Sequence, residues 1–211
     1  MSHLPCFSSL LTGARVIPVL TIAHVEEAVP LARALHAGGL NVIEVTLRTE
    51  AALRACEVIA RELPEVVLGI GTVLTPQQVN EAKSAGAKFL VTPGTSERLA
   101  QAVAECGVPT LPGAATASEM VRLMEFGFRE LKFFPAEAAG GVDYLKSVAG
   151  PLSELKFCPT GGISPNNAEK YLALKSILCV GGSWMAPKAL IDAGDYAGIT
   201  RLAAEAARLG R

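Results

Sequence analysis

Residues 41–49 read NVIEVTLRT, a short stretch in which polar and aliphatic side chains alternate. Successive side chains of a β-strand point to opposite faces, so Glu44, Thr46 and Arg48 share one face and aliphatic side chains share the other. The aliphatic face has to pack against another layer of the protein. We therefore expect the three polar side chains to point into the interior of a sheet that curls on itself.

Seven similar runs of β-branched and apolar residues occur along the chain, and each is followed by a longer segment of mixed polarity. Successive runs begin 20 to 26 residues apart, which is enough for a strand, a loop and a helix of about three turns. The eight runs begin at Arg15, Asn41, Val66, Lys88, Val108, Glu130, Leu155 and Ile177.

The segments between these runs have helical periodicity, with apolar residues three and four positions apart. Examples are residues 26–39, 75–87, 96–107 and 116–127. Several of them open with Ser or Thr followed by Glu or Gln and close with Gly, residues that favour helix starts and ends. The sequence therefore predicts eight strand–helix units and an α/β fold.

Two architectures accommodate eight such units, a closed (β/α)8 barrel and an open doubly wound sheet. The loop after the first strand, LTIAHVEE at 20–27, lacks the G-x-G-x-x-G turn that would favour the open sheet. Even spacing without a central crossover favours a compact (β/α)8 TIM barrel. We expect a single domain over residues 1–211, with an N-terminal segment at 1–14, barrel strands within 15–183 and a C-terminal helical segment at 184–211.

The composition argues against a membrane or nucleic-acid partner. Half of the 211 residues are hydrophobic, yet no stretch approaches the roughly 20 apolar residues of a membrane-spanning helix. Lys plus Arg number 19 against 20 Asp plus Glu, and no basic cluster marks a nucleic-acid surface.

Cysteine usage indicates a reducing compartment. The five cysteines are odd in number and widely spaced without a C-x-x-C pair, which argues against a disulfide framework and a zinc site. Residues 1–11 show no signal-peptide pattern. We therefore expect a cytoplasmic protein.

A lysine interrupts the apolar run in ELKFFPAE at 130–137. If its two immediate neighbours face the helices, Lys132 and Phe134 face the barrel interior. The second and sixth runs are both even-numbered, and alternate strands supply each interior layer of such a barrel. The pattern therefore predicts that Lys132 lies in the same layer as Glu44 or next to it.

A buried lysine at that position suits nucleophilic catalysis. Burial disfavours the charged form of an amine, and the neutral amine is the form that attacks a ketone to give a Schiff base. Two structural alternatives stay open: Lys132 reaching solvent at the lower rim, or an internal ion pair between Glu44 and Arg48. Lys88 and Lys156 lie nearer the starts of their strands, away from the catalytic end.

Glycine pairs follow the last two runs, in CPTGGIS at 158–164 and VGGSW at 180–184. Loops after the seventh and eighth strands are a frequent phosphate site in these barrels, because glycine lets backbone N–H groups approach phosphate oxygens. Plain tight turns are the alternative. The candidate phosphate-binding residues are Thr160, Gly161, Gly162, Gly181, Gly182 and Ser183.

Thr72 follows the third run in GIGTVL at 69–74 and offers a hydroxyl at the catalytic end. A helix cap is an equally open interpretation of this threonine. The three histidines, His3, His24 and His36, fall in the N-terminal segment, a loop and a helix. We therefore expect neither a Ser-His-Asp triad nor a His-ligated metal.

Five motifs, taken together and in order, resemble the 2-keto-3-deoxy-6-phosphogluconate (KDPG) aldolase family, which includes 4-hydroxy-2-oxoglutarate aldolases. One small departure is Ile70, where we expect alanine in that pattern. The motifs are EVTLRT at 44–49, GTVL at 71–74, KFFPAE at 132–137, CPTGGIS at 158–164 and GGSW at 181–184.

The resemblance implies a role for each matching residue. Lys132 matches the family's Schiff-base lysine, Glu44 its proton-transferring carboxylate, and Arg48 and Thr72 the residues that hold the pyruvate carboxylate. Phe134 would form a pocket wall. The expected phosphate-binding residues are Thr160, Gly161, Gly162, Gly182 and Ser183.

The resemblance also implies a trimeric (β/α)8 barrel that needs neither cofactor nor metal. Its substrate would be a phosphorylated keto acid, cleaved to pyruvate and D-glyceraldehyde 3-phosphate. Three alternatives stay open at this point. They are a 2-keto-3-deoxy-6-phosphogalactonate aldolase, a non-covalent sugar-phosphate isomerase or epimerase using Glu44 as base, and a non-catalytic sugar-phosphate binding protein.

Overall fold

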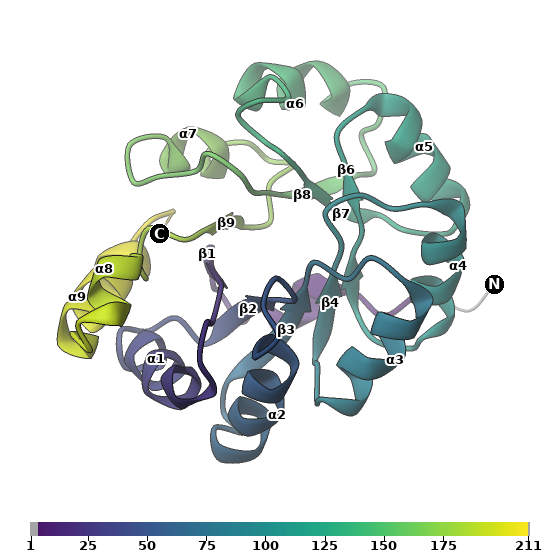
Figure 1. Cartoon of the computed structure of the whole chain (residues 1–211). Helices are drawn as coiled ribbons and strands as arrows, with labels where there is room; N and C mark the ends of the chain where they lie inside the picture. Colours follow the sequence, from purple (N-terminus) through teal and green to yellow (C-terminus); the bar gives the residue numbers. More distant parts are fainter. Residues whose placement is uncertain (1–3, 211) are drawn as a thin grey trace.

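The computed structural model describes residues 4–210, so His3 lies outside the described residues. Each of the eight sequence runs contains at least one short strand, and helices follow the strands as expected (Figure 1). The strands are β1 (Val16–Leu20), β2 (Val42–Thr46), β3 (Val67–Gly71), β4 (Phe89–Val91), β5 (Thr110–Leu111), β6 (Gly113–Ala114), β7 (Glu130–Phe133), β8 (Lys156–Pro159) and β9 (Val180–Gly182).

The helices begin and end close to the limits that the sequence predicts. Helix α3, for example, has Thr75 as its N-cap, where the side chain accepts a hydrogen bond from the Gln78 backbone N–H, and Pro76 at its first position. The helices are η1 (Phe7–Leu10), α1 (Val25–Ala37), α2 (Ala52–Glu62), α3 (Pro76–Ser84), α4 (Glu97–Glu105), α5 (Ala117–Glu125), α6 (Gly141–Ala149), α7 (Ala168–Leu172), α8 (Lys188–Asp192) and α9 (Tyr196–Ala206).

All strand pairs are parallel, and the sheet curls around a common centre with the helices outside (Figure 1). Six strands pair in the order β5-β4-β3-β2-β1-β9, and three in the order β6-β7-β8. The fifth predicted run is split at Pro112, which has no N–H to donate to a ladder. The structure thus confirms the α/β class with parallel strands.

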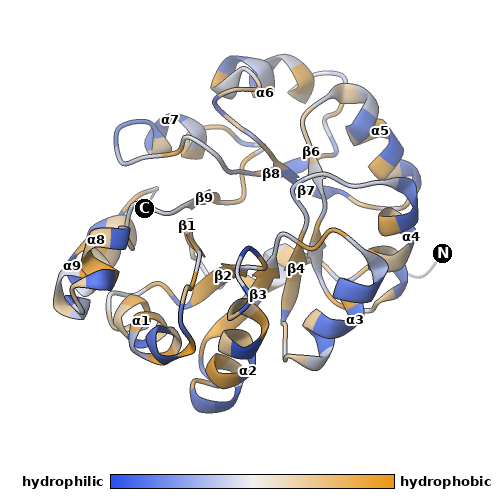
Figure 2. Ribbon diagram, in the orientation of Figure 1, coloured by the Kyte–Doolittle hydropathy of each residue, from blue (hydrophilic) through white to orange (hydrophobic). Residues whose placement is uncertain are grey.

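The two faces of the strands belong to two different apolar clusters. Ile43 and Val45 of β2 pack in the outer cluster between strands and helices, whereas Val42 belongs to an inner cluster. Leu131 and Phe133 of β7 also lie in the outer cluster. The helices turn hydrophilic faces outward, and strands β1, β2 and β4 are coloured largely as hydrophobic (Figure 2). This arrangement confirms the alternation that the sequence predicts along β2 as far as Thr46.

The inner cluster fills the end of the sheet where the strands begin. Phe7 of η1 is fully buried, and its ring meets that of Phe89 edge-on at 4.9 Å between centroids. Gly69 of β3 leaves the space that the Phe89 ring occupies. The backbone N–H of Ser8 donates to Glu130 Oε2 at 3.1 Å. The N-terminal segment therefore plugs this end of the sheet.

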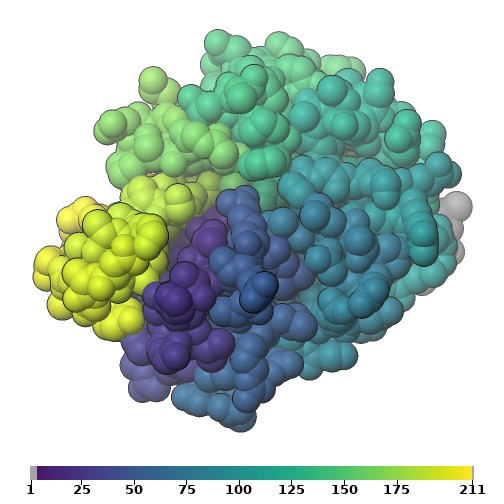
Figure 3. All heavy atoms as spheres, viewed as in Figure 1, coloured from purple at the N-terminus to yellow at the C-terminus, as the bar shows by residue number. Residues whose placement is uncertain are grey.

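The C-terminal helix packs against the first α-helix of the chain. Helix α9 packs against α1, where Thr200 Oγ1 donates to the carbonyl of Ala34 at 3.1 Å and Gly38 lies against Ala203. Figure 3 shows this C-terminal segment in yellow beside the purple N-terminal region. Within residues 4–210, no helix is long and apolar enough to cross a membrane.

Candidate active site

Lys132 and Glu44 meet in the interior, as their strand positions predict. Lys132 Nζ donates to Glu44 Oε1 at 3.2 Å, and each side chain is only 5 % exposed. The ammonium also lies 5.4 Å from the centroid of the half-buried Phe134 ring. The contact excludes a Lys132 that reaches solvent at the lower rim.

Strand register brings the two side chains to the same level. In β7, Lys132 pairs with Gly113 of β6 and Cys158 of β8, and its backbone N–H donates to the Pro112 carbonyl at 3.0 Å. Glu44 pairs with Val19 on one side and Gly69 on the other. Each of the two strands is therefore hydrogen-bonded to a neighbour on both sides, and the backbone positions of Glu44 and Lys132 are fixed. This matters because a buried charge pair is costly unless its geometry is good.

Gly71, which sequence reasoning did not single out, makes room for Glu44. Any side chain at this position would collide with the Glu44 carboxylate. A glycine inside a strand often marks such a close approach, so the GIGT motif itself carried a usable signal.

Arg48 does not lie inside the sheet, and the prediction of a buried guanidinium on the β2 face is wrong. Strand β2 ends at Thr46, and Arg48 is exposed in the following loop, where its N–H donates back to the Thr46 carbonyl. The alternation stops because the ladder ends and the chain turns toward α2. No hydrogen bond or ion pair of the Arg48 side chain occurs within residues 4–210. An internal ion pair between Arg48 and Glu44 is excluded with it.

Thr72 has a strained backbone at the end of β3. Its φ of 59° lies in the left-handed region, which a β-branched residue rarely adopts. It does not cap α3, because Thr75 takes that position. The helix-cap interpretation of Thr72 is therefore wrong, and strain of this kind gathers at functional sites.

The two glycine loops lie next to each other. Thr160, at the end of β8, forms a β-bridge with Gly181, and its buried Oγ1 has no hydrogen-bond partner within the described part of the chain. Gly161 and Gly162 have φ values of 100° and 78°, so both need the freedom of glycine. A buried hydroxyl without a partner is costly in a folded protein and points to a ligand at this position.

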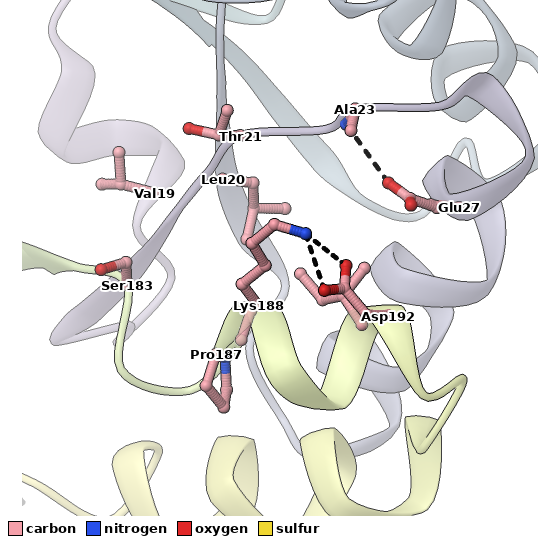
Figure 4. A pocket seen from close by; sticks show the side chains of 11 residues that line it. Val19, Leu20, Thr21, Ala23, Glu27, Ser183, Pro187, Lys188 and Asp192 are labelled. Carbon is pink, nitrogen blue, oxygen red and sulfur yellow. Dashed lines mark hydrogen bonds and ion pairs between the residues drawn. The ribbon is translucent and has the colours of Figure 1, made fainter.

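Ser183 is exposed and borders a cavity of about 300 Å³ that sequence reasoning did not foresee (Figure 4). Its lining includes Leu20 and Thr21 at the end of β1 and Lys188 and Asp192 of helix α8. Lys188 and Asp192 lie on the same helix, and Lys188 Nζ donates to Asp192 Oδ1 at 2.6 Å and Oδ2 at 2.7 Å.

Known proteins resemble this chain over most of its length. Residues 7–202 match the family model for KDPG and KHG aldolase. The KHG/KDPG aldolase of Escherichia coli K12 is 54 % identical over 198 residues, covering 94 % of this chain and 93 % of that protein.

Solved structures agree with the sequence match. KDPG aldolase from Legionella pneumophila, solved with pyruvate captured as a covalent carbinolamine intermediate, has a TM-score of 0.93 and 42 % identity, covering 95 % of this chain and 97 % of that one. The Zymomonas mobilis ZM4 enzyme with 3-phosphoglycerate has a TM-score of 0.90 and 45 % identity, covering 95 % and 94 %. The chain belongs to the KDPG and KHG aldolase family.

Proposed function

We propose that this protein is a class I aldolase that cleaves 2-keto-3-deoxy-6-phosphogluconate to pyruvate and D-glyceraldehyde 3-phosphate. Its second substrate is 4-hydroxy-2-oxoglutarate, cleaved to pyruvate and glyoxylate. The carrying observation is the buried contact between Lys132 Nζ and Glu44 Oε1. The covalent pyruvate adduct named for the Legionella relative supports the same chemistry.

The reaction begins with Lys132. Its ammonium group loses a proton to solvent, and the neutral amine attacks the C2 ketone to give a carbinolamine. The carbinolamine hydroxyl takes up a proton and leaves as water, which gives a protonated imine. Glu44, acting through a water molecule, removes the C4 hydroxyl proton. The C3–C4 bond breaks, the aldehyde leaves, and the bonding electrons move into the imine to form an enamine. Glu44 then returns a proton to C3, and water hydrolyses the imine to release pyruvate.

The remaining site residues hold the substrate. Arg48, exposed beside the catalytic end of β2, binds the pyruvate carboxylate with paired hydrogen bonds, and the Thr72 hydroxyl donates to the same group. Phe134 forms one wall of the pocket near Lys132. Orientation of the ketone over the amine supplies part of the rate.

The phosphate of the substrate binds to the glycine loops, where the unpartnered Thr160 hydroxyl supports a hydrogen bond to an oxygen of the ligand. Backbone N–H groups of the loops donate to the other oxygens. The residues assigned to this role are Thr160, Gly161, Gly162, Gly182 and Ser183.

We also propose that the units close into one (β/α)8 barrel, forming a single domain over residues 1–211. Strand β9 pairs with β1, the bridges Phe157–Ile177 and Thr160–Gly181 connect the β8 and β9 segments, and only Pro112 separates β5 from β6. The protein acts as a cytoplasmic homotrimer with no metal or cofactor. Light scattering of the purified protein tests the trimer, and full activity in EDTA tests the absence of a metal.

Borohydride trapping tests the mechanism. Pyruvate plus borohydride should inactivate the enzyme and add the reduced pyruvate mass to the peptide that contains Lys132. A matched variant, Lys156→Arg, should be trapped like the wild type, whereas Lys132→Arg should not. Full activity after treatment, or the added mass on Lys156, would refute the Schiff-base assignment.

The other candidate functions have less support. The matching family model and the 54 % identical relative both carry the KDPG and KHG names, which favours the gluconate substrate over the galactonate one. A non-covalent isomerase or epimerase, or a simple binding protein, would not be inactivated by borohydride with pyruvate. The trapping experiment therefore separates these classes as well.

A further inference from the structure

We propose that Tyr171 and Glu137 form a clasp that positions the phosphate loop relative to Lys132 and thereby sets the preference for phosphorylated keto acids. The phosphate loop is the segment 160–162 after β8. This inference rests on the proposed function, because it assigns a cause to the substrate preference of the same site. Neither residue touches the reacting atoms, so both are positioning residues.

The clasp joins two elements that follow different strands. Tyr171 lies on α7 and is fully buried, and its hydroxyl donates to Glu137 Oε1. Glu137 lies in the loop after β7, five positions beyond Lys132. The bond therefore links α7, which follows the phosphate loop, to the loop that follows the nucleophile-bearing strand β7.

Backbone hydrogen bonds run alongside the clasp. The N–H of Ala136 donates to the Thr160 carbonyl at 2.8 Å, and the N–H of Glu137 donates to the Gly161 carbonyl at 3.1 Å. The segment after Lys132 thus extends the ladder between β7 and β8 into the phosphate loop. A shift of Glu137 moves the loop that has to hold the phosphate.

Two glycines show how closely the clasp is packed. A side chain at Gly162 would meet the Glu137 Cγ and Cβ at 2.7 and 2.8 Å. A Cβ at Gly141 would meet the Tyr171 hydroxyl at 3.1 Å and Glu137 Oε1 at 3.2 Å. Gly162 therefore meets two requirements that only glycine meets here, a φ of 78° and room for the Glu137 side chain.

The Tyr171 hydroxyl keeps its proton in the folded protein. Burial, followed by the hydrogen bond and the negative charge of Glu137, raises the pKa of this phenol above its ordinary value of 10.0. The clasp donor is therefore present across the pH range in which an amine nucleophile works. The imine chemistry uses Lys132 and Glu44, so the hydrogen bond between Tyr171 and Glu137 takes no part in it.

The distance between Lys132 and the phosphate loop matters only for a substrate that has both a ketone and a phosphate. KDPG spans both subsites, whereas 4-hydroxy-2-oxoglutarate has no phosphate and uses the Lys132 end alone. A loosened clasp should therefore weaken binding of the first substrate and leave the second nearly unchanged. A purely structural pair would affect both substrates alike.

Kinetics of Tyr171→Phe on the two substrates tests the proposal. The variant keeps the buried ring and removes one hydroxyl, so we expect kcat/KM for KDPG to fall about tenfold, mainly through KM. For 4-hydroxy-2-oxoglutarate we expect a change of less than about twofold. Tyr144→Phe is the matched control, because Tyr144 stacks on Phe133 and its hydroxyl has no hydrogen bond within residues 4–210.

Variants of the exposed Glu137 give a second test that keeps the buried Tyr171 side chain intact. Glu137→Gln keeps an oxygen that accepts from Tyr171 and should retain the wild-type substrate preference, whereas Glu137→Ala should behave like Tyr171→Phe. Equal losses on both substrates, or an unchanged preference in Tyr171→Phe and Glu137→Ala, would overturn the clasp. A wild type that cleaves neither substrate would refute the proposed function, and the clasp with it.

Discussion

The two ends of the same strands differ sharply in chemistry. Where the strands begin, Phe7, Leu11, Phe89 and Cys179 form an apolar cluster. Where they end lie a buried charge pair, a strained threonine and a buried hydroxyl that has no hydrogen-bond partner among residues 4–210. Along β2 the change takes two residues, from Val42 in the apolar cluster to the Glu44 carboxylate.

This difference teaches how the fold divides stability and chemistry. Burying a carboxylate and an ammonium together is close to neutral at best, because their attraction has to offset the loss of hydration of both ions. The apolar end supplies hydrophobic burial, which is the dominant favourable term in folding. The polar end is then free to hold groups that would not be selected for stability alone.

Replacing the charge pair by apolar residues should give the largest effect and the clearest separation of the two roles. We expect Glu44→Leu combined with Lys132→Met to lower kcat/KM by at least about 10³-fold, since both reacting groups are lost. The free energy of unfolding should stay level or rise, because two charges no longer need to be desolvated. Activity assays and urea denaturation measure the two quantities.

A large loss of stability in that double variant would mean that the charge pair supports the fold. It would contradict the conclusion that the polar end contributes chemistry and not stability. The single variant Glu44→Leu is the control. It leaves the Lys132 ammonium buried without a partner, so it should be less stable than the double variant.

A substitution in the apolar cluster at the other end of the strands should affect stability and leave activity nearly unchanged. Phe7→Ala should destabilise the protein by about 3–5 kcal/mol, because it opens a cavity in the apolar cluster. Below the new melting temperature, kcat should remain within about twofold of the wild type. A fall in kcat as large as the fall in stability would show that the two ends are not independent.

Sequence periodicity predicts those features of the structure that follow from the repeated strand–helix units. Lys132 and Glu44 are 88 residues apart. Their contact follows from the even spacing of the runs, because Glu44 lies in the second run and Lys132 in the sixth, and alternate strands of a barrel share an interior layer. The inward direction of both side chains follows from the alternation within each strand. The eight runs themselves come from the same regularity, although Pro112 divides one of them into β5 and β6.

Features that break the repetition could not be predicted. Arg48 leaves the β2 face because the last ladder bond is that of the Leu47 N–H to the Gly71 carbonyl, and no local sequence pattern marks that last bond. Thr72 follows β3, three residues before the Thr75 cap, and no sequence pattern marks its left-handed backbone. Tyr171 of the short helix α7 meets Glu137 of the loop after β7, and the loops that place both residues have no sequence period.

Strain at Thr72 offers a smaller test of the same division. Thr72→Gly should relieve the left-handed backbone and raise the free energy of unfolding by about 1 kcal/mol. The same change removes the hydroxyl, so kcat/KM should fall about tenfold. Thr72→Ser is the control, because it keeps the hydroxyl and should retain most of the activity. Improved stability with unchanged activity would remove Thr72 from the proposed site.

Titration of the buried Cys179 thiol at the apolar end should have the smallest effect on the free energy of unfolding, and only at alkaline pH. Burial, followed by the neighbouring Cys158, raises the pKa of the Cys179 thiol well above its ordinary value of 9.0. Above pH 9 the unfolded chain releases this proton while the folded protein keeps it. Because the folded state then binds more protons, the free energy of unfolding falls as pH rises, by about 1 kcal/mol from this thiol at pH 9.5.

Cys179→Ala should therefore lose less stability than the wild type between pH 8 and pH 9.5, as measured by urea denaturation at each pH. Cys6→Ala is the matched control, since it removes a thiol that folding leaves exposed. Equal pH dependence in the wild type and Cys179→Ala would mean that this end tolerates a thiolate. The contrast between an apolar end that resists charge and a polar end that uses it would then be weaker than the buried cluster indicates.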